Sequence, residues 1–78
     1  MKAATKKMVQ NAISPYVHWD DVYPYIFQKD VPRITSKLLA NFSNVYCSIA
    51  GNDTECPVFI VKSKKHVPFL KIIIERGI

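Results

Sequence analysis

The hydrophobic residues between positions 30 and 42 recur at spacings of three and four, which places them on one face of a helix. This face consists of Val31, Ile34, Leu38 and Phe42. Asp30 suits the N-cap, and Pro32 is tolerated in the first turn. The opposite face is small, polar and basic, with Arg33, Ser36, Lys37 and Ala40. Because this face has no carboxylate, the pattern predicts a helix that can lie against a polyanion, although an ordinary amphipathic helix with a solvated face fits it too.

The preceding part of the chain predicts two more helices. The first covers residues 1–14 and stops at Pro15, which cannot continue a helix. Residues 16–19 are aromatic and β-branched and predict a short strand or an extended connector. A second, short helix is predicted over residues 21–28, with an aspartate at its N-cap. A link of about three residues then leads into the 30–42 helix, which is the outline of a helix-turn-helix.

A β-hairpin is predicted after the third helix. Residues 45–50 and 56–62 are rich in β-branched and aromatic residues, and the Gly-Asn pair between them suits a two-residue type I′ or II′ turn. With this turn, Cys47 and Cys56 face each other at a non-hydrogen-bonded position, where a disulfide is geometrically possible. A longer loop and two buried free thiols are the alternatives, because disulfides are unusual in a reducing cytosol.

Residues 67–78 are predicted to form a final helix. Pro68 near its start and Gly77 near its end follow the usual asymmetry of helix ends. Its apolar face consists of Phe69, Leu70, Ile73 and Ile74. The β-branched run at 72–74 leaves a strand open as the alternative. Ile72 falls partly off the apolar face, and this exposed surface predicts a homodimer with the segment in its interface, unless the segment only completes the monomer core.

The composition fits one folded, intracellular domain that spans residues 1–78. Hydrophobic residues make up 49% and charged residues 22% of the chain, which argues against disorder. No apolar run approaches the roughly 20 residues that cross a bilayer, and residues 1–13 lack the apolar region of a signal peptide. We therefore expect a cytoplasmic protein that is not inserted in a membrane. The net charge of +5 favours an anionic partner, with nucleic acid ahead of an anionic membrane surface.

The order helix, extended piece, helix, helix, hairpin and final helix resembles the winged-helix variant of the helix-turn-helix family over residues 4–62. The resemblance implies an α+β fold with three helices, a β-hairpin wing and a C-terminal helix or strand. It makes residues 30–42 the recognition helix, which enters the major groove, and residues 45–62 the wing. Asp53 and Glu55 near the wing tip depart from the family's DNA-binding members, in which basic residues are commoner there.

These observations predict a sequence-specific protein that binds duplex DNA and regulates transcription as a homodimer, without catalysis, metal or cofactor. Arg33 is expected to read guanine, and Ser36 and Asn41 to contact base edges or phosphates. The lysines expected to neutralise phosphates are Lys37, Lys62, Lys64 and Lys65. The alternative is a winged-helix module for protein–protein interaction in a larger assembly, which the acidic wing tip and the abundant aromatic residues favour.

Other chemistry is less well supported by the sequence. The cysteines and histidines match no zinc spacing, and nothing orients a cysteine–histidine pair for nucleophilic catalysis. Aromatic residues make up 12% of the chain. They either pack in the core with their polar tips at the surface, or stack on the bases of single-stranded nucleic acid.

Overall fold

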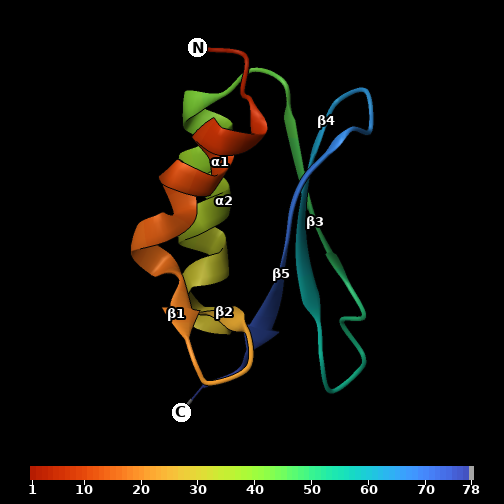
Figure 1. Cartoon of the computed structure of the whole chain (residues 1–78). Coiled ribbons are helices and arrows are strands. Elements are labelled where there is room, and N and C mark those ends of the chain that lie inside the picture. Colours follow the sequence, from red (N-terminus) through yellow and green to blue (C-terminus); the bar gives the residue numbers. More distant parts are fainter. Residues whose placement is uncertain (78) are drawn as a thin grey trace.

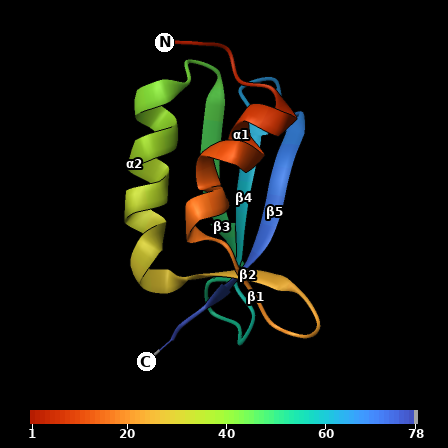
Figure 2. The same ribbon diagram turned by 60° about the vertical axis from the view of Figure 1, so that its left-hand side comes forward.

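The structure, a computed structural model, describes residues 1–77 and combines a helical layer with one five-stranded sheet (Figure 1). The helices are α1 (Lys6–Ile13) and α2 (Val31–Asn41), with short 3-10 turns at Ser14–Tyr16 and Gln28–Asp30. The strands are β1 (His18–Trp19), β2 (Pro24–Phe27), β3 (Val45–Ala50), β4 (Val58–Ser63) and β5 (Pro68–Glu75). The sheet order is β1-β2-β5-β4-β3, in which β2 and β5 are parallel and the other neighbours antiparallel. Both helices lie on the same side of the sheet (Figure 2), and in the described part of the chain the other side is open (Figure 1).

The core lies between the helical layer and the sheet. Its most deeply buried side chains are Val9, Ile13, Ile26, Ile34, Leu38, Phe59 and Val61. Strand β4 shows how the sheet contributes, because Phe59 and Val61 are buried while Val58 and Ile60 are only partly so. Side chains of successive strand residues point to opposite faces, so the first two face the helices and the other two face the open side.

The two helices follow the predicted pattern with one change of boundary. The predicted helix over residues 30–42 is confirmed as α2, with Asp30 in the N-cap position but without a capping hydrogen bond from its side chain. The first helix starts at Lys6 and not at residue 1, because Thr5 caps it. The Thr5 Oγ1 accepts a hydrogen bond from the Met8 N–H at 3.3 Å, and the residues before Thr5 are not helical.

The predicted second helix over residues 21–28 is wrong. The aspartate expected at the helix N-cap is Asp21, but it is the Asp20 side chain that accepts hydrogen bonds from the N–H groups of Val22 and Tyr23, at 2.7 and 2.8 Å. These bonds form an Asx turn, which competes with helix formation and here reverses the chain between β1 and β2. The β-prone residues after the turn form β2, which pairs with β5 nearly fifty residues later.

The predicted helix over residues 67–78 is also wrong, as is the fold that depended on it. Residues 68–75 of this segment form β5, the central strand, while residue 78 lies outside the described residues. The β-branched run at 72–74 favours this form, and Pro68 is tolerated at the first residue of a strand. Two helices over a five-stranded mixed sheet are not a winged helix, which has three helices. The side chain of Ile72, expected to be exposed, faces the helices and is only 5% exposed, so it does not support the predicted dimer.

The hairpin is present, but its predicted register is wrong. Ala50 pairs with Val58, and Cys47 pairs with Val61 instead of Cys56. Residues 51–57 form a longer loop, in which Gly51 O accepts hydrogen bonds from the N–H and the Oγ1 of Thr54 at 2.9 and 2.6 Å. The predicted register would have turned Val58 and Ile60 toward the core, whereas the observed register buries the larger Phe59 together with Val61.

Candidate nucleic-acid interface

The charged residues are divided between the two ends of the molecule. The N-terminal segment, the start of α1 and the β4–β5 turn lie at one end, which we call the basic end (Figure 1). Its lysines are Lys2, Lys6, Lys7, Lys62, Lys64 and Lys65. All six aspartate and glutamate residues belong to segments at the opposite, acidic end, namely the β1–β2 and β3–β4 loops, the α2 N-terminus and the end of β5. The basic end therefore carries most of the positive charge that attracts a polyanion.

Asn44 holds the basic end together. Its Oδ1 accepts a hydrogen bond from the Ala4 N–H at 2.6 Å, and its Nδ2 donates to Ala4 O at 3.3 Å. Its backbone carbonyl accepts from the Lys64 N–H at 2.8 Å. The Lys2 N–H also donates to Asn41 O at 3.3 Å. One asparagine thus joins the N-terminal segment, the connection between α2 and β3, and the β4–β5 turn.

The β4–β5 turn is ordered around a buried serine. The Ser63 Oγ accepts hydrogen bonds from the N–H groups of Lys65 and Val67 at 3.2 and 3.0 Å. The backbone of Ser63 bonds to Val67 and His66, which closes the turn. His66 has φ = 67°, a left-handed conformation that is uncommon for a residue other than glycine. The turn therefore presents Lys64, Lys65 and His66 to solvent on a defined backbone.

The open face of the sheet continues from the basic end. Tyr46 on β3 pairs with Lys62 on β4, and the Tyr46 residue is 56% exposed. Farther along the same face, Ile60 lies between Ser48 and Lys71. We define these side chains, Tyr46, Ser48, Ile60, Lys62 and Lys71, as the open-face platform. It combines an exposed aromatic ring, an apolar surface and two lysines, and among the described strand residues the one carboxylate on this face is that of Glu75, near its far end.

The far end of the open face is aromatic and closed by a hydrogen bond. The His18 and Phe27 rings lie 5.6 and 5.5 Å from the Tyr25 ring, with centroids in the range of aromatic pairs. Tyr23 Oη donates to Glu75 Oε1 at 2.6 Å. This hydrogen bond, with a smaller effect of burial, raises the pKa of Tyr23 to about 12. The end of β5 is thus tied to the β1–β2 loop.

The residues predicted to bind DNA form two separate groups. Lys62, Lys64 and Lys65 are part of the basic end. On α2, the side chain of Arg33 is 71% exposed and lies toward the acidic end, 3.9 Å from Asp30, while Ser36 is exposed on the same outward face. The lysines that the prediction omitted, Lys2, Lys6 and Lys7, are visible in the sequence as a basic N-terminus, but their meeting with the β4–β5 turn is not.

Lys37 and Asn41 are used within the helical layer. Lys37 Nζ donates to Ala12 O at 2.8 Å and lies 5.5 Å from the centre of the Tyr16 ring, so it joins α2 to the end of α1. Asn41 Nδ2 donates to Lys37 O at 2.7 Å, one turn earlier in the same helix. Both side chains therefore have protein partners, and Lys37 does not extend freely from the surface as predicted.

The cysteines are free thiols, one half-buried and one exposed. Cys47 lies on β3 three residues before Ala50, roughly 10 Å along the strand from the loop that carries Cys56. Burial raises the pKa of the Cys47 thiol. Within residues 1–77, no group of three or more histidine, cysteine, aspartate or glutamate side chains is placed to hold a metal ion.

Comparisons with known proteins give no match. No protein-family model matches the chain, and neither the curated proteins nor the solved structures contain a significant match. In the part of the chain that the structure describes, neither helix is long and apolar enough to cross a membrane.

Proposed function

We propose that this protein binds single-stranded nucleic acid, with the phosphates at the basic end and the bases on the open-face platform. The observation that carries the proposal is the gathering of six lysines from three chain segments at one end, with the carboxylates at the other. Lysines that neutralise phosphates release counterions, and this supplies a large part of the affinity for nucleic acids.

Tyr46 and Lys62 favour a single strand as the ligand. An aromatic ring beside a cationic groove is the combination on which successive bases stack while phosphates are neutralised. In proteins that bind single-stranded RNA, aromatic side chains on an open sheet face provide such a surface. The platform lies on one face of a sheet and not on a protruding helix. It therefore suits contact with the unstacked bases of a single strand better than insertion into the groove of a duplex.

Duplex DNA is the second candidate ligand, favoured by the outward face of α2. Arg33, Ser36 and Ala40 are exposed there, and these small and basic side chains present no steric or charge barrier to a major groove. However, Arg33 lies roughly 12 Å along the axis of α2 from the C-terminus of this helix, and it is the C-terminus that adjoins the basic end. Base contacts from α2 and phosphate contacts from the basic end would then require a duplex that spans both.

The test compares two triple variants with equal changes in charge. The first, Lys62→Ala with Lys64→Ala and Lys65→Ala, removes three positive charges from the basic end. The second, Lys29→Ala with Arg33→Ala and Arg76→Ala, removes three from the acidic end. Fluorescence anisotropy would follow binding to labelled oligothymidine of about 15 nucleotides and to a duplex of the same length, each over a series of salt concentrations.

For single-stranded binding we expect the basic-end variant to lose up to about 2 from the salt slope of log K, since each phosphate contact contributes about 0.7. The acidic-end variant should keep the parental slope. Tyr46→Ala should weaken binding by about 1–3 kcal/mol, the usual effect of removing one stacked base. Equal losses in both triple variants would contradict the proposal. Stronger binding to the duplex, lost in the acidic-end variant, would favour the second candidate.

A further inference from the structure

Strand β5 has a free edge along its first half. β4 pairs with β5 over residues 68–73, but β2 pairs with it only over residues 73–75. Among the described residues, the second side of residues 68–72 therefore carries no strand, and we call this side the β5 edge. An unpaired strand edge is a template for another extended chain.

The backbone of Lys71 faces this edge. The Ile74 N–H donates to Pro57 O at 2.9 Å, on the β4 side. In an antiparallel pair, the backbone groups of successive residues point to opposite sides. Those of Ile72 therefore point toward β4 and those of Lys71 toward the β5 edge. Lys71 thus offers one N–H and one C=O to an added strand.

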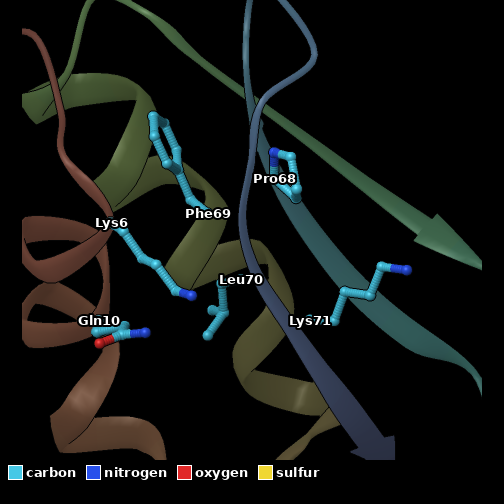
Figure 3. A pocket seen from close by; sticks show the side chains of 6 residues that line it. All are labelled: Lys6, Gln10, Pro68, Phe69, Leu70 and Lys71. Atoms are coloured by element: carbon cyan, nitrogen blue, oxygen red, sulfur yellow. The ribbon is translucent and has the colours of Figure 1, made fainter.

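A cleft runs between the β5 edge and α1 (Figure 3). Its first part is a cavity of about 450 Å³ lined by Lys6, Gln10, Pro68, Phe69, Leu70 and Lys71. A second cavity of about 270 Å³ shares Gln10, Leu70 and Lys71 with the first and extends it to Trp19 and Pro24. Trp19 is 74% exposed, so an apolar side chain in the cleft would gain a large aromatic contact.

The charges beside the β5 edge are positive on both sides of the strand. Lys6 extends from α1 toward the edge, and Lys71 points away from α1 (Figure 3). No carboxylate lines either cavity. Pairing of two copies through this edge would bring both lysines of each copy near those of the other, and lysines on an edge strand are a common protection against such pairing. An acidic segment would instead be attracted.

We propose that the β5 edge binds an extended segment of a partner protein in which acidic and apolar residues alternate. Because side chains along a strand alternate between faces, the acidic ones reach Lys71 while the apolar ones enter the cleft beside Leu70 and Trp19. This interaction goes beyond nucleic-acid binding and stands on different observations, namely the unpaired backbone and the cleft.

The probe is a fluorescein-labelled Val-Glu-Val-Glu-Val peptide, and binding to the full chain would be measured by fluorescence anisotropy. The first control is the same peptide with an N-methyl group on every peptide nitrogen, which keeps its charge but removes the backbone N–H donors from both of its edges. The second control is Val-Lys-Val-Lys-Val. Lys71→Glu reverses the charge on the β5 edge, and Lys7→Glu makes the same change on α1, at a residue that lines neither cavity.

We expect N-methylation and Lys71→Glu each to weaken binding at least tenfold, and Lys7→Glu to change it less than about twofold. Lys71→Glu should gain affinity for the lysine peptide, which a merely unfolded variant would not do. In hydrogen exchange, the Lys71 amide should become protected when the glutamate peptide is added. The proposal is overturned if the N-methylated peptide binds as well as the parent, or if protection appears on β3 instead. It is also overturned if the Lys71 amide is protected without peptide in proportion to protein concentration, because a second copy would then occupy the edge.

Discussion

Replacing Asn44 tests how the basic end is assembled. Asn44→Ala removes two hydrogen bonds to Ala4, at 2.6 and 3.3 Å, and leaves a partly buried N–H and C=O without these partners. Each such bond contributes about 0.5–1.5 kcal/mol, and an unsatisfied group adds to the loss. We therefore expect the free energy of unfolding to fall by about 2 kcal/mol. The basic end should also weaken, although no charge is removed.

Urea denaturation measures the loss of stability. With a slope of about 1 kcal/mol per molar urea for a domain of this size, the midpoint should fall by about 2 M. Asn11→Ala is the matched control, because Asn11 is exposed on α1 and its side chain joins no segments. Its midpoint should change by less than about 0.5 M, since exposed substitutions usually cost within 0.5 kcal/mol.

Asn44→Asp separates stability from charge. The aspartate keeps the acceptor for the Ala4 N–H, so most of the stability should remain. It also places a negative charge at the basic end, so the affinity for oligothymidine should fall more than the stability does. A midpoint for Asn44→Ala within about 0.3 M of the parent, with unchanged affinity, would refute the role of Asn44 as the joint of the basic end.

Three further outcomes test the corrected register and the titrating groups. Phe59→Ala should lower the free energy of unfolding by about 3–5 kcal/mol, and Val58→Ala by much less, because only the Phe59 side chain is in the core. Equal losses for the two variants in urea denaturation would contradict the observed register. In an ultraviolet titration, Tyr23 should ionise near pH 12. The stabilising hydrogen bond of its neutral form should be present below about pH 10 and lost as the pH rises through 12. A Tyr23→Phe variant whose highest tyrosine pKa stays near 12 would contradict this assignment. Alkylation near pH 8 should modify Cys56 before Cys47, whose thiol is half-buried with a raised pKa, and a disulfide in protein trapped at lysis would contradict the free thiols.

The sequence was informative where local patterns decided the structure. The spacing of three and four in residues 31–42 predicted α2, and the two β-rich runs predicted β3 and β4. It was misleading where pairing with a strand distant in sequence decided the structure. Pro68 and Gly77 suit the start and the end of a helix, but pairing with β2 and β4 on either side makes this segment a strand. Such pairing leaves no local signal apart from the β-branched run.

The candidate site shows the same division. Lys62, Lys64 and Lys65 are neighbours in sequence, so their shared surface could be predicted. Arg33 and Lys37 were added to them on the assumption that α2 is a recognition helix. In the structure α2 starts at the acidic end and packs beside α1, which separates Arg33 from these lysines and engages Lys37. The N-terminal lysines are held at the basic end by the bonds of Asn44 to Ala4 and of the Lys2 backbone to Asn41 and Ser43, contacts between residues about 40 positions apart.

The most direct test of nucleic-acid binding by the basic end is a titration of isotope-labelled protein with oligothymidine, followed residue by residue in amide NMR spectra. We expect the largest shift changes at residues 2–7, 44–46 and 62–66, with smaller changes along Ile60 and Lys71, and all of them should diminish as salt is added. Shift changes concentrated on residues 33–40 of α2 or on the loops of the acidic end, or no change at low salt, would contradict the proposed interface.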